Sequence, residues 1–373
     1  IDELTNRQDL PTWDNFVERI EEIDDTLDRA WSTVGHLNSV MNSDALRAAY
    51  NACLPKLSDY YTEMGQNRAP FECYRAVASQ EHLDATQRRL LDNALRDFHL
   101  SGVDLPTDKK ARYKEISQEL SRLTSKYSEN VLDATNAWSK LVTDESRLGG
   151  MPDSARGLAK QTAEQRGEQG WMLTLDFPSY LSVMTYADDR ALRQEVYEAY
   201  STRASDQGPH AGRWDNTEIM EQILSLRHEL AQLLGYENYA TRSLVTKMAR
   251  ETDEVMTFLN DLAAHSVTRA RNELAELAAF AGEHYGVAEL EAWDLAFYSE
   301  KLREHRYSVT EEEIRPYFPV TRVLSGMFSV VDHGMEVRII KASTAKNVID
   351  AKISFSPAST PPGMPVQAVL QIT

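Results

Sequence analysis

The sequence predicts an all-α fold with one short pair of strands and a change of character near residue 330. Apolar residues recur at spacings of three and four along most of residues 1–330. One stretch near 171–186 instead reads like two short strands, and residues 331–373 contain a single aromatic side chain, Phe355. The length of 373 residues suits about two domains, or one large helical one, at roughly 100–200 residues per domain.

Charge and composition exclude some classes of protein. The chain carries 40 Lys and Arg against 58 Asp and Glu, a net charge of -18, whereas a nucleic-acid binder needs a positive surface. Its 16 Tyr, 10 Phe and 6 Trp argue against extensive disorder. Two cysteines, Cys53 and Cys73, are too few for a disulfide framework or a four-thiolate zinc site, which favours reduced thiols and a cytoplasmic location. Residues 1–10 are polar and acidic and do not resemble a signal peptide.

The strongest helical pattern runs from about Asp108 to Val142. Its apolar residues follow one face, its charged residues follow another, and Leu105-Pro106-Thr107 supplies a breaker and a cap before it. At 1.5 Å per residue this helix would be about 50 Å long, which suggests an extended helical wall. Similar patterns predict helices over Thr12–Gly35, Asp44–Met64, Asp84–Phe98, Asp188–Ala204, Thr217–Leu234, Thr252–His284 and Ala288–Arg306.

Two strands are predicted at Trp171–Asp176 and Tyr180–Tyr186, joined through Phe177-Pro178-Ser179. The stretch Ala155–Gly170 before them is rich in Gly and Gln, and we expect an exposed connector there.

Residues 331–373 differ from the helices before them. Their net charge is +1 against -19 for residues 1–330, and the segments Met335–Lys341, Asn347–Phe355 and Val366–Thr373 have a β-like composition. We expect a small β appendage or a disordered tail. The 21 uncharged residues from Ile353 onward contain four prolines, so no membrane helix is predicted.

No conventional catalytic motif occurs in the sequence. The nearest match to the zinc motif H-E-x-x-H is His228-Glu229-Leu230-Ala231-Gln232, whose fifth residue is a poor zinc ligand. His228 lies off the apolar stripe of its predicted helix, which favours a surface or hydrogen-bonded histidine. Nucleophile elbows and glycine-rich phosphate loops are also missing from the sequence. The residues therefore identify no catalytic residue and no metal ligand, and leave substrate-binding residues unknown.

Three stretches combine polar aromatic residues with charges: Tyr200–Trp214, Arg227–Ala240 and Trp293–Lys301. Such residues suit a packed polar interface or the lining of a cleft, and the interface is the favoured interpretation.

These stretches also carry a resemblance to the thimet oligopeptidase and oligopeptidase A family of zinc metallopeptidases. The resemblance is nearly continuous from about residue 12 to 330. It includes Ser32–Ser43, Asp92–Gly102, Tyr127–Asp144, Leu173–Tyr186, Tyr200–Gly208, Arg227–Ala240, Trp293–Lys301 and Arg315–Pro319.

The resemblance implies the N-terminal half of a bowl-like or clam-like fold, whose long helices form one wall of a deep channel for short peptides. It also implies a zinc ion on the other wall, held by the two histidines of H-E-x-x-H and a later Glu. Because this chain lacks that motif and the resemblance stops near Val330, no zinc ligand is carried over, and no zinc is expected to bind. We expect residues 1–330 to be one channel wall and residues 331–373 to be a divergent tail, frameshifted or otherwise replaced.

The leading hypothesis is thus the N-terminal portion of a peptide-degrading zinc metalloendopeptidase, inactive alone. Two alternatives remain: a non-catalytic peptide-binding protein, and one half of a split peptidase whose zinc half is a separate chain. Short peptides are the expected ligands, with no nucleic acid and no membrane among the partners.

Overall fold

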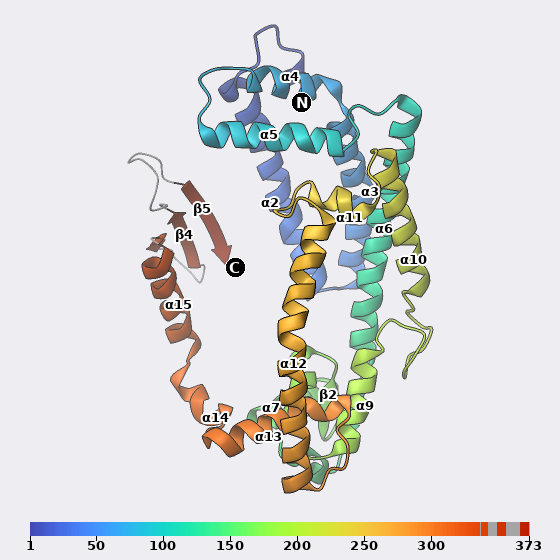
Figure 1. The fold of residues 1–373 in the computed structure, drawn as a ribbon, viewed down its shortest axis with the longest axis vertical. Coiled ribbons are helices and arrows are strands. Elements are labelled where there is room, and N and C mark those ends of the chain that lie inside the picture. Colours follow the sequence, from blue (N-terminus) through green and yellow to red (C-terminus); the bar gives the residue numbers. More distant parts are fainter. Residues whose placement is uncertain (336, 342–348, 356–365, 373) are drawn as a thin grey trace. The chain divides into compact units, whose positions relative to one another are not determined.

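The computed structural model describes residues 1–335, 337–341, 349–355 and 366–372, with side chains for residues 1–310 and 313–331. It consists of two compact units, residues 1–294 and 295–373 (Figure 1). The predicted all-α class is confirmed, because helices make up most of the described chain. No helix in the described ranges is both long enough and apolar enough to cross a membrane.

Unit 1 contains nearly all of the helices that the sequence predicts. In chain order its longer elements are α1 (Asp2–Thr5), α2 (Glu18–Val40), α3 (Asp44–Gln66), α4 (Arg68–Ala78), α5 (Ala85–Leu100), α6 (Thr107–Ala137), β1 (Ser139–Val142), α7 (Asp153–Gln165), β2 (Trp171–Thr174), α8 (Phe177–Tyr186), α9 (Arg190–Ser201), α10 (Thr217–Leu233), α11 (Tyr239–Leu244) and α12 (Thr252–Tyr285). Short turns of other helical types occupy Trp13–Val17, Glu145–Leu148 and Ala292–Asp294.

The predicted long helix is real, but it ends five residues early. α6 stops at Ala137, and Trp138 has an extended backbone that leads into β1. The prediction ran on to Val142 because Trp138 and Leu141 continue the helical spacing. Strand pairing and burial decide the structure of this segment instead. β1 pairs with β2, and Trp138 and Val142 are buried in the core. At 31 residues, α6 is about 46 Å long.

The predicted strand pair was half right. Trp171–Thr174 forms β2, but its antiparallel partner is β1. The second predicted strand, Tyr180–Tyr186, lies within α8. Pro178 fits the first turn of a helix, where its missing N–H is not needed. The consecutive residues Val183 and Met184 are both buried, whereas in a strand they would point to opposite faces.

The expected connector Ala155–Gly170 was wrong over most of its length, because α7 covers Asp153–Gln165. Ala159 and Ala163 lie one turn apart on the buried face of α7. Their small side chains let the helix approach β2 closely, but they give little hydrophobic signal in the sequence.

Three groups of buried side chains hold unit 1 together. The largest joins α7, β2, α8 and α9 through residues such as Leu148, Leu173, Val183, Leu192 and Val196. A second lies between α2, α4 and α5, and a third between α6 and α10. α3 and α10 each pack along α6 (Figure 1), so α6 is the central helix of this part of the unit.

Unit 2 contains α13 (Leu295–Tyr307), α14 (Glu311–Ile314), a short turn (Arg315–Tyr317) and α15 (Val320–Met335). Three strands follow, β3 (Val337–Lys341), β4 (Ile349–Phe355) and β5 (Val366–Ile372), antiparallel in the order β3-β4-β5. They correspond to the three segments of β-like composition. The change of composition after Val330 falls inside α15.

Candidate functional site

The stretch Tyr200–Trp214 packs against other helices of unit 1. The Tyr200 ring stacks on Tyr180 of α8 at 3.8 Å between centroids. The Arg203 guanidinium lies 3.6 Å from the Tyr200 ring and donates a hydrogen bond to Thr135 Oγ1 at 2.9 Å. This stretch therefore joins α9 to α8 and to the end of α6, as the interface interpretation predicted.

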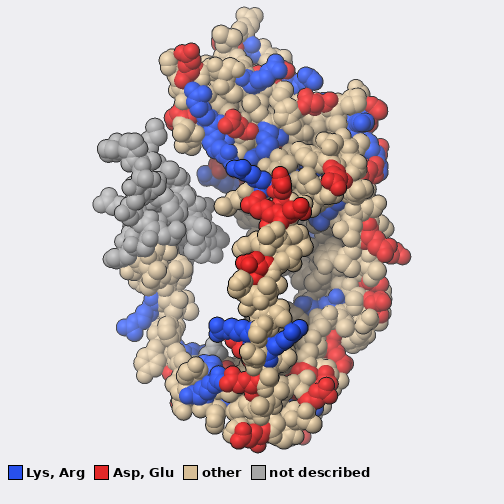
Figure 2. All heavy atoms as spheres, viewed as in Figure 1, with Lys and Arg blue, Asp and Glu red and all other residues tan. Residues whose placement is uncertain are grey.

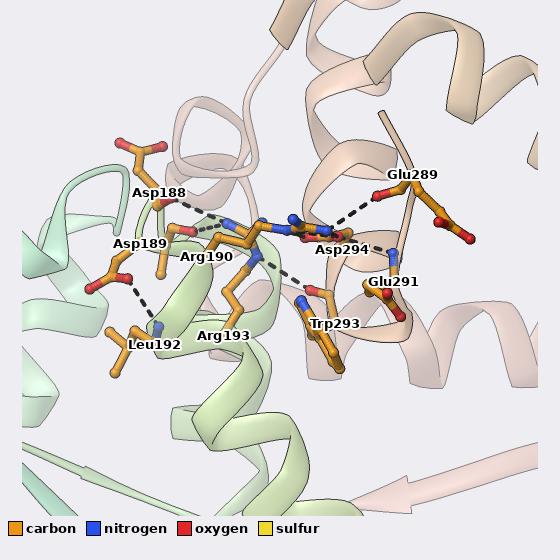
Figure 3. A network of polar contacts seen from close by, with 10 residues as sticks. Asp188, Asp189, Arg190, Leu192, Arg193, Glu289, Glu291, Trp293 and Asp294 are labelled. Atoms are coloured by element: carbon orange, nitrogen blue, oxygen red, sulfur yellow. Dashed lines mark hydrogen bonds and ion pairs between the residues drawn. The ribbon is translucent and has the colours of Figure 1, made fainter. Parts of the chain in front are cut away.

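The start of the third stretch, Trp293–Lys301, enters a buried ionic network (Figure 3). Asp294 has 0% side-chain exposure and accepts hydrogen bonds from Arg190 Nη2 at 2.6 Å and Arg193 Nη2 at 2.8 Å. Arg193, itself only 1% exposed, also donates to the Ala187 carbonyl. Burial raises the pKa of Asp294, but the hydrogen bonds from the two arginines outweigh it, so that pKa lies below its ordinary value. The network fixes α9 to the turn before residue 295.

The stretch Arg227–Ala240 differs, because part of it lines a groove of about 700 Å³. The floor is α6, and α2, α3, α10 and α11 supply the sides. The lining residues are Gly35, Asn38, Ser39, Asn42, Tyr50, Leu54, Leu120, Ser121, Thr124, Ser125, Ser128, Glu129, Val131, Leu132, Thr135, Arg227 and Tyr239.

Small residues keep this groove open. Four residues of α6, Ser121, Thr124, Ser125 and Ser128, present short hydroxyl side chains where longer ones would fill the space. Opposite them on α2, a methyl group added at Gly35 would meet no atom within 4 Å. The groove therefore combines hydrogen-bonding side chains with apolar surface from Leu54, Leu120, Val131 and Leu132.

Two charged residues line the groove. The Arg227 guanidinium lies 5.1 Å from the centroid of the Tyr239 ring, a distance typical of a cation–π contact. Glu129 accepts a hydrogen bond from Asn51 Nδ2 at 2.7 Å. Burial, with a smaller contribution from the Glu129 charge, raises the pKa of Tyr50, whose ring stacks on Trp31.

The nearest match to a zinc motif does not form a metal site. His228 is exposed, and Gln232 donates to the Glu237 carbonyl at 2.6 Å. Arg112 binds both carboxylate oxygens of Glu229, at 2.6 and 2.8 Å, and lowers the pKa of that carboxyl. The side chains in the described ranges include no cluster of three or more His, Cys, Asp or Glu able to hold a metal ion. Both cysteines are free thiols, with Cys53 exposed.

Sequence reasoning missed the groove, although one signal for it exists. The apolar and charged residues of α6 dominate its sequence pattern, and the signal lies in the small hydroxyl residues Ser121, Thr124, Ser125 and Ser128 between them. Leu120 and Val131 belong to the apolar face and also line the groove, and Leu120 packs against the buried cluster between α6 and α10 as well.

Acidic and basic side chains are interspersed over the face of unit 1 seen in Figure 2, with no continuous basic surface on that face.

Comparison with known proteins identifies the family. Residues 2–110 match the family model described as Neurolysin/Thimet oligopeptidase, N-terminal domain, and residues 183–357 match Peptidase family M3. The second match extends beyond Val330, where we expected the resemblance to end. That residues 331–373 are a frameshifted or otherwise replaced tail stays a prediction.

Two curated relatives illustrate the similarity. Oligopeptidase A of Escherichia coli K12 is 54% identical over 323 residues, 86% of this chain and 48% of the relative. The probable cytosolic oligopeptidase A of Arabidopsis thaliana is 38% identical over 360 residues, 92% of this chain and 50% of the relative. The chain spans about half the length of the curated relatives it matches. On these matches, the chain belongs to the thimet oligopeptidase and oligopeptidase A family of peptidases.

Proposed function

We propose that this chain forms one wall of the peptide channel of an oligopeptidase A-like zinc metalloendopeptidase that degrades short peptides. The observation that carries the proposal is the 54% identity to Escherichia coli oligopeptidase A over 323 residues. The groove along α6 supports it, because hydroxyl and amide side chains suit the backbone of an extended peptide. The name of the Arabidopsis thaliana relative supports a cytoplasmic location.

In this proposal the ligands of the catalytic zinc belong to residues outside this chain. The family's zinc would activate water for attack on a peptide bond, and the described side chains offer no donor set that fits the ion. The proposal is therefore that residues 1–373 alone do not hydrolyse peptides.

This part of the proposal is tested with the purified chain. The chain is incubated with zinc, dialysed, analysed for bound metal and assayed with a short quenched-fluorescent peptide. We expect no stoichiometric zinc and no turnover. Stoichiometric zinc together with turnover that a chelator abolishes would refute it.

A split peptidase is the second candidate, and α12 favours it. Most of α12 before Leu277 is exposed, including Met256, Phe258, Leu259 and Leu262 at spacings of three and four. An uncovered apolar face of this kind marks a protein interface. We propose that a polypeptide carrying the zinc half covers it.

The split is tested by mixing. The C-terminal half of Escherichia coli oligopeptidase A, as a separate chain, should co-elute with residues 1–373 and restore chelator-sensitive hydrolysis. Failure of the two chains to associate counts against the split. If the chain alone binds short peptides in a calorimetric titration and no zinc half associates with it, the non-catalytic binding protein is the better description.

A further inference from the structure

Arg227 is the unusual residue of the groove along α6. Its side chain is half-buried, yet no carboxylate in the described part of the chain pairs with it. Its neighbour Glu229 is occupied by Arg112. A half-buried guanidinium held on an aromatic ring keeps its N–H donors available for an anion.

The position of Arg227 along α6 follows from two contacts. Glu229 pairs with Arg112, and Asn216 accepts a hydrogen bond from Asn130, so α10 runs antiparallel to α6. Arg227 therefore lies at the end of the groove near Leu120. Glu129 follows Leu120 by nine residues, which is about 13 Å along α6 at 1.5 Å per residue.

The length of the groove suits a short extended peptide. The α6 residues that line it run from Leu120 to Thr135, which is about 22 Å of helix. An extended chain rises about 3.3 Å per residue, so six or seven peptide residues fit. Uncharged hydrogen-bonding side chains such as Asn38, Ser121 and Thr124 line this path and can pair with peptide N–H and C=O groups.

We propose that this groove binds a short extended peptide with its free C-terminal carboxylate on Arg227. The inference rests on the proposed function and adds the end of the peptide that is recognised. A planar guanidinium matches a carboxylate with two parallel hydrogen bonds. Glu129 lies past the middle of the α6 stretch that lines the groove, and its negative charge would repel a carboxylate placed beside it. The net charge of -18 also disfavours polyphosphates and nucleic acids as the anion.

The test is isothermal titration of the 373-residue chain with two six-residue alanine-rich peptides, identical except that one is C-terminally amidated. Amidation removes the charge from the group that Arg227 binds, and partial exposure of Arg227 keeps the loss at the low end for a hydrogen bond to a charged group. We expect amidation to weaken binding about tenfold in the wild-type chain and less than twofold in Arg227→Gln.

Two further variants control for indirect effects. Arg213 is an exposed arginine 4.2 Å from the ring of Trp214 and does not line the groove, so Arg213→Gln should keep the tenfold difference. Gly35→Leu should fill the hollow and weaken both peptides, whereas Gly35→Ala should leave both unchanged. Far-UV circular dichroism checks that each variant is folded.

Equal binding of the acid and the amide by the wild-type chain overturns the inference, as does absence of binding by either peptide. Hydrolysis restored by the separate zinc half would leave the proposed function standing in both cases. If restored hydrolysis is unchanged by Arg227→Gln, with acid and amide peptides cleaved equally, only the anchor is wrong.

Discussion

Removing the carboxylate of Asp294 should destabilise unit 1 more than breaking any of its surface ion pairs does. In Asp294→Ala the Arg193 guanidinium, 1% exposed, would remain buried without its carboxylate. Breaking a buried pair in this way costs about 3–5 kcal/mol. Arg193 keeps its hydrogen bonds to the carbonyls of Ala187 and Trp293, so the expected loss in the free energy of unfolding is near 3 kcal/mol.

Two comparisons separate charge from packing. Asp294→Asn keeps the size and one acceptor but loses the charge, so its cost should be smaller, about 1.5–3 kcal/mol. The Lys140–Glu195 pair also joins two distant elements, β1 and α9, but both its side chains are partly exposed. Glu195→Gln should therefore change the free energy of unfolding by less than about 1 kcal/mol.

The assay is urea unfolding followed by far-UV circular dichroism, with the slope of each transition checked against the wild type. Replacing both partners, as in Arg193→Met with Asp294→Leu, should recover part of the loss seen in Asp294→Ala. An Asp294→Ala chain whose free energy of unfolding lies within about 1 kcal/mol of the wild type would refute the reasoning, because removing the carboxylate from a buried guanidinium should cost more than that.

Three further predictions concern other parts of the same unit. The folded pKa of Asp294 is depressed, so its carboxylate contributes its full stability above its ordinary pKa of about 3.9. The difference in the free energy of unfolding between the wild type and Asp294→Asn should therefore be constant from about pH 5 to 8 and shrink on acidification. A difference that grows in acid would contradict this prediction. Leu192→Ala, at a fully buried site, should cost about 2–5 kcal/mol in urea unfolding, whereas Leu224→Ala, 65% exposed, should cost less than about 0.5 kcal/mol; similar losses would show that the core is wrongly placed. Replacing Met256, Phe258 and Leu262 by Ser should reduce the fluorescence of bound ANS without lowering the urea midpoint; a lowered midpoint would mean that these side chains are covered within the chain.

The helices with continuous apolar periodicity were predictable from the sequence. The prediction for α3 was right at its start and short at its end, while α10 and α12 fell within one residue of their predicted bounds. In these helices the local pattern and the tertiary packing agree.

The errors fall where local pattern and packing diverge. The residues of α8 satisfy both strand and helix spacing, and Pro178 in the first turn together with packing against α9, α7 and β2 selects the helix. β1 was read as the end of α6, because its strand partner lies about 30 residues away in the sequence. Pairing over such distances leaves no signal in a local window.

The groove could not have been predicted for a related reason. Gly35, Ser121 and Arg227 come from three separate helices, and each is unremarkable in its own segment. The sequence did identify Arg227–Ala240 as unusual, but it did not show which of those residues face a hollow. Asp294 was marked as part of a polar-aromatic stretch, and its two arginine partners lie about 100 residues earlier.

Hydrolysis of one quenched-fluorescent peptide, measured before and after a zinc-bearing half is added, tests the central claim most directly. The claim is that residues 1–373 supply a channel wall and another polypeptide segment supplies the catalytic metal. It predicts no turnover by the zinc-treated chain alone, and turnover that a chelator abolishes once the C-terminal half of Escherichia coli oligopeptidase A is present. Chelator-sensitive turnover by the 373-residue chain without that half would contradict it.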